Sequence, residues 1–269
     1  IAVGETVQVV DAAGVPNLPG GYYLIFKVNP LSDITELLLT NNTSQPVAVT
    51  INPDYTATAS VANAYYLQGT AVAITGHAVK SNGTAAGNVA VDVYVINNGY
   101  RKTIAATTNA QGDFSTVYTP LTNEAGHYMV SAGYPGTNTS EEQDAFDILG
   151  VRINSGAVPQ FKVTINDTLR GSLQVVNLSN QALNDFTIDK ISVPGGASIH
   201  FDTIQTLAGN ATASIGYEVS GSSISPGTVF SVAGMNAVSR EGTIQPLNIF
   251  YFCQAPNGYV EADISSIDV

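Results

Sequence analysis

Residues 67–136 contain the clearest β-strand pattern of the chain; they begin LQGTAVAITGHAVKSNGTAAGNVAVDVYVINNG at Leu67 and end at Gly136. Within them, residues 72–79 and 89–95 place small or β-branched side chains at every second position. Successive side chains of a β-strand point to opposite faces, so this spacing gathers one such row on one face. A helix needs apolar residues three and four positions apart, and neither run follows that spacing. We therefore expect two half-buried β-strands here.

Tight-turn sequences separate these strands from their neighbours. Asn82-Gly83 and Asn98-Gly99 supply the residue types that tolerate positive φ in hairpin turns. Residues 109–113 form another short connection, which leads into predicted strands at 114–118 and 125–132. Turns that recur at intervals of about 8–12 residues are typical of immunoglobulin-like sandwiches. The segment is therefore predicted to form two stacked antiparallel sheets.

A longer pattern of glycines, β-branched residues and aromatics runs through the same segment. Its members are Gly69, Thr70, Val72, Ile74, Gly76, Gly87, Val89, Val91, Thr108, Asn109, Ala110, Gln111, Gly112, Phe114, Pro120, Ala125, Gly126 and Tyr128. In this order they resemble the bacterial immunoglobulin-like domains that occur in tandem on surface proteins. The resemblance implies a β-sandwich and names no ligand.

The length of the chain sets the number of units. Its 269 residues allow two to three sandwiches, because such domains contain about 100 residues each. We predict an all-β protein of tandem immunoglobulin-like β-sandwich domains. The predicted units are a partial one at 1–52, a sandwich at 53–150 and a second sandwich at 151–269, with the bacterial immunoglobulin-like module itself at 55–150.

The first unit contains too few strands to close a sandwich. Strands are expected at residues 6–14, 22–30 and 44–51, and an isolated half-sandwich leaves strand edges and an apolar face open. The residues that carry a second resemblance are Gly21, Tyr22, Tyr23, Leu24, Val28, Asn29, Pro30, Ile34, Glu36, Asn41, Asn42, Val47 and Val49. They resemble the C-terminal half of CARDB-type adhesion-related domains. Asn29 stands where that family usually has Asp, and the apolar run at 37–39 replaces a usually polar stretch.

The third unit shows the same alternation. Strands are predicted at 161–165, 171–177, 186–191, 207–219 and 247–253. The spacing of Gly171, Leu173, Val175 and Asn177, together with the strand at 207–219, resembles another immunoglobulin-like sandwich of bacterial surface and secreted proteins. Cys253, the single cysteine, lies in the last of these strands and is expected to be a buried small apolar residue.

Charge and cysteine content limit the partners and the compartment. The formal net charge is −12, with 9 Lys and Arg against 21 Asp and Glu, which disfavours nucleic acid and anionic membranes as partners. No apolar run approaches the length of a membrane span, so direct membrane insertion is not expected. A chain with one cysteine forms no internal disulfide, which fits a microbial cell-surface or other extracellular protein. Because it begins at Ile1 without Met, we interpret it as a piece of a longer protein.

Acidic residues gather between the second and third units. Glu141, Glu142, Asp144 and Asp147 could supply the several oxygen ligands that calcium needs. A solvated acidic linker, or acids on the outer face of a strand, is the alternative interpretation, since the spacing of a calcium loop is absent.

A copper site, a catalytic site and an aromatic binding surface have weaker support in the sequence. A strand corner like that of the first unit also occurs in lysyl oxidase copper domains, but copper needs a tight histidine cluster. His77, His127 and His200 are far apart in sequence and are interpreted as isolated histidines. The Gly-x-Ser-x-Gly motif is missing, so we predict no catalytic residues and no cofactor. The chain has no Trp but 13 Tyr, and Tyr22 and Tyr65 are candidate surface aromatic contacts.

Together these features predict a non-enzymatic stalk or spacer of a large microbial cell-surface or secreted protein. Its partners would be a protein or glycan at the cell surface, or neighbouring domains of the same polypeptide. Two alternatives remain: accessory modules of a secreted multidomain hydrolase, which could bind glycans, and a filament-forming surface subunit whose first unit accepts a strand.

Overall fold

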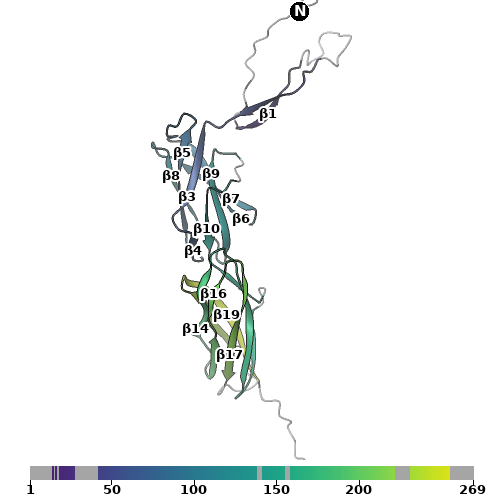
Figure 1. The fold of residues 1–269 in the computed structure, drawn as a ribbon, viewed down its shortest axis with the longest axis vertical. Helices are drawn as coiled ribbons and strands as arrows, with labels where there is room; N and C mark the ends of the chain where they lie inside the picture. The colour runs from purple at the N-terminus through teal and green to yellow at the C-terminus, as the bar shows by residue number, and fades with distance from the viewer. Residues whose placement is uncertain are drawn as a thin grey trace, which may run out of the picture.

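The computed structural model describes residues 14, 16, 18–27, 42–137, 141–154, 158–221 and 231–254. This part of the chain consists of β-strands and their connections, which confirms the predicted all-β class. No helix in it has the length and apolar character of a membrane span. A hairpin and two sandwiches follow one another along the long axis of the molecule (Figure 1).

The middle sandwich packs a five-stranded sheet on a three-stranded sheet. The five-stranded sheet has the order β4-β10-β9-β6-β7, with bounds Tyr65–Tyr66, Asp144–Ile148, Gly126–Gly133, Ala90–Asn97 and Tyr100–Thr107. The facing sheet has the order β3-β5-β8, with bounds Tyr55–Val61, Val72–Lys80 and Asp113–Tyr118. Two sheets that stack face to face bury one row of alternating side chains from each strand.

The C-terminal sandwich repeats this plan with one more strand. Its four-stranded sheet has the order β11-β13-β17-β15, with bounds Val151–Ile153, Thr168–Asn177, Thr212–Gly221 and Ala197–Phe201. Its five-stranded sheet has the order β12-β19-β18-β14-β16, with bounds Gln160–Thr164, Gly242–Gln254, Ser231–Ser239, Leu183–Ser192 and Ile204–Leu207. In both sandwiches the first strand is divided between the two sheets. Its second part pairs in parallel with the last strand, as β4 with β10 and β12 with β19.

The alternation that predicted the first two strands is confirmed by burial. Val72, Ile74 and Ala78 of β5 are fully buried, and so are Val91 and Val93 of β6. The Asn98-Gly99 turn between β6 and β7 has positive φ at both residues, 47° and 79°, as its sequence requires.

The observed strands differ from the predicted ones at several places. The predicted strand at 207–219 is two strands, because a turn follows Leu207 and β17 begins at Thr212. Strands β15 and β18 had not been predicted, since Ala, Gly, Ser and Asn in them weaken the alternation that marks a strand. The strand expected at 6–14 and the apolar run at 37–39 lie outside the described residues, apart from Gly14.

Each sandwich has its own buried core. In the middle sandwich Phe146 is 1% exposed and its ring stacks on Tyr128, with centroids 5.1 Å apart. In the C-terminal sandwich Phe161 is equally buried and lies 4.6 Å from the ring of Tyr217. Cys253 belongs to this second core and is 1% exposed, as predicted.

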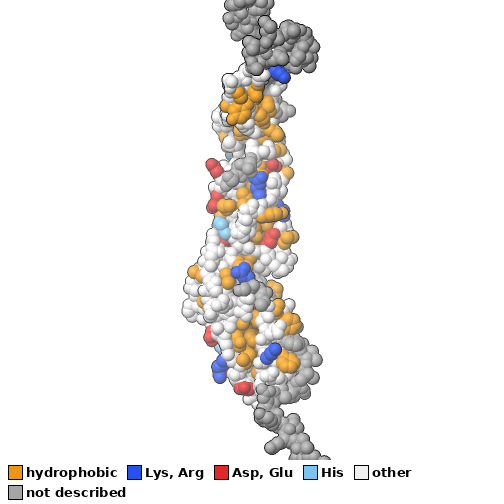
Figure 2. Space-filling view, turned by 90° about the vertical axis from the view of Figure 1, so that its right-hand side faces the viewer, with side chains coloured by type: hydrophobic (Ala, Val, Ile, Leu, Met, Phe, Trp, Pro, Cys, Tyr) orange, Lys and Arg blue, Asp and Glu red, His pale blue; other side chains and the backbone are white. Residues whose placement is uncertain are grey.

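The N-terminal hairpin pairs β1 (Gly20–Leu24) with β2 (Val47–Ile51) as a two-stranded sheet. Tyr22 lies opposite Val49 and Leu24 opposite Val47, so these apolar side chains share one face. Leu24, Val47 and Val49 are 39–54% exposed. Hydrophobic side chains also gather near the upper end of the described surface (Figure 2). A two-stranded sheet of this kind is marginally stable alone, and no second sheet of the described residues covers its apolar face.

One glutamine side chain joins the two sheets of the middle sandwich at their open edge. The Gln143 amide oxygen accepts hydrogen bonds from Ala59 N at 2.8 Å and Ala132 N at 2.9 Å. Its amide nitrogen donates to Ala57 O at 3.0 Å and Ala132 O at 3.1 Å. The side chain therefore fills the place of a peptide group between β3 and β9, and it satisfies backbone groups that a strand edge leaves unpaired.

We expect Gln143→Ala to lower the free energy of unfolding of the middle sandwich by about 2 kcal/mol, because four hydrogen bonds are lost. The amides of Ala59 and Ala132 should exchange hydrogen faster, which amide exchange followed by NMR would measure. Gln111→Ala is the matched control, since Gln111 is exposed and its side chain forms no hydrogen bond with another described residue. Equal stability of the two variants would contradict the proposed role of Gln143.

Candidate functional site

The junction between the two sandwiches is the best-defined contact region of the described chain. Two residues, Leu149 and Gly150, separate the end of β10 from the start of β11. Leu149 is fully buried in the C-terminal core, and its backbone N–H donates to Tyr66 O of the middle sandwich at 2.9 Å. One linker residue is therefore held by both sandwiches.

Gly150 allows the close approach of the chain at this point. A Cβ at residue 150 would lie 2.3 Å from the Ala125 Cβ and 2.9 Å from the Gln68 Nε2. The Gly150 carbonyl oxygen also accepts a hydrogen bond from Leu178 N at 3.0 Å. Any larger side chain at residue 150 would push the β8–β9 loop of the middle sandwich away from the linker.

A second set of contacts lies beside the linker. The Gln245 Oε1 of β19 accepts hydrogen bonds from Val151 N at 3.0 Å and from Gln68 Nε2 at 3.4 Å. Leu67 packs against the C-terminal core, and its side chain would lie 3.2 Å from a Cβ at Gly242. Residues just before β5 of the middle sandwich thus contact the last strand of the other sandwich.

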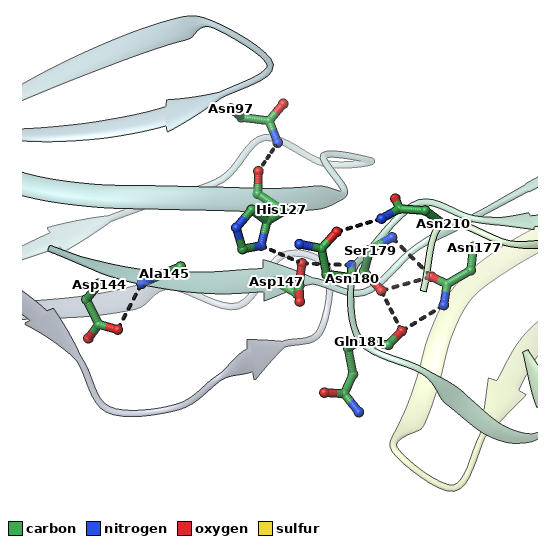
Figure 3. A network of polar contacts seen from close by, with 10 residues as sticks. All are labelled: Asn97, His127, Asp144, Ala145, Asp147, Asn177, Ser179, Asn180, Gln181 and Asn210. Carbon is green, nitrogen blue, oxygen red and sulfur yellow. Dashed lines mark hydrogen bonds and ion pairs between the residues drawn. The ribbon is translucent and has the colours of Figure 1, made fainter. Parts of the chain in front are cut away.

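A polar network forms another side of the junction (Figure 3). Asp147 of β10 is nearly buried, with its side chain 9% exposed, and its Oδ1 lies 3.2 Å from His127 Nδ1. The same oxygen accepts a hydrogen bond from Asn180 N at 3.0 Å, in the loop between β13 and β14. Asn97 Nδ2 donates to His127 O at 2.8 Å, which fixes the backbone that carries the histidine. One carboxylate therefore links a strand of the middle sandwich to a loop of the C-terminal one.

Buried polar groups fix the conformation of the β13–β14 loop. Asn177 is 1% exposed, and its Nδ2 donates to Gln181 O at 2.7 Å and Leu207 O at 3.2 Å. Its Oδ1 accepts hydrogen bonds from the backbone N–H and the hydroxyl of Ser179, at 3.0 and 2.8 Å. Buried polar groups that are fully bonded rigidify their surroundings. The loop therefore presents Asn180 to Asp147 in one defined position.

The structure does not bring the four predicted calcium ligands together. Glu141 and Glu142 are exposed, whereas Asp144 accepts hydrogen bonds from Val61 N and Ala145 N, each at 2.8 Å. Asp147 points to the junction instead. Within the described ranges no group of three or more His, Cys, Asp or Glu residues is placed to hold a metal ion. The structure thus gives Asp144 and Asp147 structural partners, and calcium binding stays a prediction.

The tyrosines and histidines named from the sequence are dispersed. Tyr65 of β4 is 37% exposed, while Tyr22 is half-buried and donates its hydroxyl hydrogen to Leu18 O at 2.7 Å. His77 lies 2.8 Å from Asp113 at the surface of the middle sandwich. His127 belongs to the junction, and His200 is exposed on β15.

Sequence reasoning missed the residues that complete the junction, namely Leu67, Gln68, Leu149, Gly150, Asn180 and Gln245. An apolar Leu followed by Gly directly after the strand Phe146-x-Ile148 was the one available signal, because a solvated linker would not need a second apolar residue there. The glutamines and Asn180 gave no signal, since isolated amides are common on any surface.

Comparisons with known proteins give only distant likeness. No family model matches the chain, and no curated protein matches it. Among solved structures it is similar to FdeC, an Escherichia coli adhesin, with a TM-score of 0.37 and 13% identity over 77% of this chain and 68% of that one. The D0-D1 domain of intimin gives a TM-score of 0.30 at 15% identity, covering 73% of this chain and 99% of that one.

A Salmonella α2-macroglobulin reacted with methylamine gives a TM-score of 0.38 at 13% identity. It is matched over 86% of this chain, which spans only 18% of the macroglobulin. At these low TM-scores, the tandem immunoglobulin-like fold is assigned from the strand order and the two cores described above.

We expect Gly150→Ala to loosen the junction while both sandwiches stay folded, because the added methyl group overlaps Ala125. NMR relaxation should then show the two sandwiches tumbling more independently than in the parent chain. Gly195→Ala is the matched control, since a Cβ there meets no atom within 4 Å. Unchanged joint tumbling in Gly150→Ala would show that the junction does not depend on this close contact.

Proposed function

We propose that this chain is a non-enzymatic stalk or spacer segment of a large microbial cell-surface or secreted protein. In this proposal the units at 1–52, 53–150 and 151–269 follow one another and hold a distal part of the polypeptide away from the surface. The observation that supports it most is the two-residue connection between β10 and β11, with Leu149 buried at its start.

A spacer must keep its length, and the junction provides a physical reason why this chain would. Domains joined by flexible linkers move relative to one another unless a sizeable interface holds them. Here Leu149 is anchored in one core and bonded to the other sandwich, and Asp147 and Gln245 form bonds across the junction. Bending would have to break these contacts together.

The topology also suits a segment under tension. Tension applied to the two ends of the C-terminal sandwich pulls β12 and β19 in opposite directions along their length. These parallel strands are paired over five residues, from Gln160 with Phe250 to Thr164 with Gln254. Hydrogen bonds between strands loaded in shear must break together, so the sandwich should resist extension better than a hairpin that unzips.

Surface charge and composition support an extracellular location as part of the proposal. A net charge of −12 keeps a long protein soluble and limits unspecific association. Cys253 is the single cysteine and is buried, so neither core is stabilised by a disulfide. The partners we propose are neighbouring domains of the same polypeptide and a protein or glycan at the cell surface. The CARDB-like resemblance of the unit at 1–52 fits this setting, and the described residues of that unit include the β1–β2 hairpin.

Single-molecule extension of the full chain from its two ends tests this function. We expect two main unfolding events, each with a contour-length gain below about 330–360 Å, because a sandwich of roughly 100 residues extends to about 3.3–3.6 Å per residue and its folded length is subtracted. Extension at low force without discrete events would contradict a load-bearing spacer.

A second candidate function, assembly into filaments, is favoured by the β1–β2 hairpin. Its apolar face carries Leu24, Val47 and Val49 in the open, and its outer edges can pair with a strand from another molecule. Light scattering of the chain should then rise with concentration, and Val49→Asp should abolish the rise. Thr50→Asp places the same charge on the other face of the hairpin and is the control. Concentration-independent scattering of the parent chain would reject assembly through this surface.

A further inference from the structure

The middle sandwich has a cleft where its two sheets separate, between the edge strands β7 and β8. It has a volume of about 250 Å³ and is closed at one end by the β8–β9 loop. Its floor consists of Val95, Tyr118 and Tyr128, each no more than 4% exposed. Pockets for drug-sized ligands measure about 300–1,000 Å³, so this cleft has room for a single small ring.

Two residues of β7 at the mouth of the cleft are unusual for their position. Lys102 pairs with Val95 and Tyr100 with Asn97, which puts them on the sheet face that carries the buried Val95. Instead of filling the core, Tyr100 is 80% exposed and Lys102 is also exposed. A charged residue that points inward on an edge strand also discourages pairing with other chains. Protection of the strand edge by Lys102 does not explain why the aromatic ring of Tyr100 beside it is exposed.

Lys102 is a cation without an anionic partner among the described residues. Its Nζ lies 4.9 Å from the centre of the Tyr118 ring, and the ion pairs of the described chain do not include it. The nearby Glu124 has other partners. Its Oε2 accepts the Tyr118 hydroxyl hydrogen at 2.6 Å and Leu121 N at 3.0 Å. An ammonium held over an aromatic ring and open to solvent is well placed to bind an incoming anion.

The cleft also offers a neutral amide and a carboxylate oxygen as hydrogen-bonding groups. Asn123 lines it with a side-chain amide that forms no hydrogen bond with another described residue, and its φ of 75° marks a tight turn of the loop. Glu124 Oε1 accepts no hydrogen bond from another described residue. A hydroxylated ring could therefore find a donor, an acceptor and an aromatic surface within one small site.

We propose that this cleft binds the terminal residue of an acidic saccharide, with its carboxylate on Lys102 and the apolar face of the sugar ring on Tyr100. Asn123 and Glu124 bond the ring hydroxyls. The proposal does not rest on the spacer function, because its anchoring side chains, Tyr100 and Lys102, make no junction contact. The cleft does adjoin the junction, since Asn97 and Ala125 line it.

The tyrosines of the floor keep the site free of further negative charge. Burial raises the pKa of Tyr128 to about 12, and the neighbouring Glu124 adds to the effect. Burial, together with the hydrogen bond to Glu124, also raises the pKa of Tyr118. Both phenols are thus protonated at neutral pH and do not repel a carboxylate.

Titration of the full chain with glucuronate, followed by NMR chemical shifts, tests the proposal. We expect shift changes centred on Tyr100, Lys102 and Asn123, and binding to glucuronate at least tenfold tighter than to glucose at low salt. Lys102→Gln should weaken binding about tenfold, and Tyr100→Ala should weaken it by a similar factor. Raising the salt concentration should weaken binding of the parent chain, because an exposed ion pair is screened.

Lys80→Gln, an exposed lysine of β5 in the same sandwich, is the matched control and should leave binding unchanged. The dispersion of the NMR spectrum reports directly whether each variant is folded. The proposal is overturned if glucuronate causes no shift changes at these residues, if glucose binds equally well, or if Lys102→Gln and Lys80→Gln behave alike.

Discussion

The last strand of one sandwich runs almost directly into the first strand of the next, and the arrangement of the molecule depends on this connection. With only Leu149 and Gly150 between β10 and β11, the second sandwich must begin where the first ends. The side chain of Leu149 belongs to the C-terminal core, so the junction cannot open without exposing apolar surface. Its position also explains why Gly is needed next, since Ala125 leaves no room for a Cβ. An elongated molecule follows from these two residues.

At both open edges of the middle sandwich the two sheets separate, and backbone N–H and C=O groups of the edge strands have no partner in a neighbouring strand of the described chain. At the edge formed by β3, the side chains of Gln143 and Asp144 bond the backbone of Ala59 and Val61 and close the gap. At the opposite edge, between β7 and β8, Lys102 and Tyr100 stay in solvent and a cleft remains. One edge is thus used for stability, and the other is available for recognition.

The acidic segment before the junction shows how one sequence feature can serve several structural roles. Read as a cluster, Glu141, Glu142, Asp144 and Asp147 suggested a cation or a solvated linker. In the fold, Asp144 bonds the edge strand and Asp147 bonds His127 and Asn180 across the junction. Residues three apart on an extended strand point to opposite faces, so Asp144 and Asp147 have different partners in the described structure. Their negative charges are stabilised by N–H donors.

The class of fold, several of the strands and the Asn98-Gly99 turn could be predicted from the sequence, because alternation along β5 and β6 and the residues of a tight turn are local properties of the chain. The junction and the cleft depend on contacts between residues that are distant in sequence. Gln143 and Ala59 are 84 residues apart, and Gln68 and Gln245 are 177 apart, yet their atoms meet. Single amides and an edge lysine carry no periodic signal. Their roles arise only when two sheets or two sandwiches come together, so they could not be read from the order of residues.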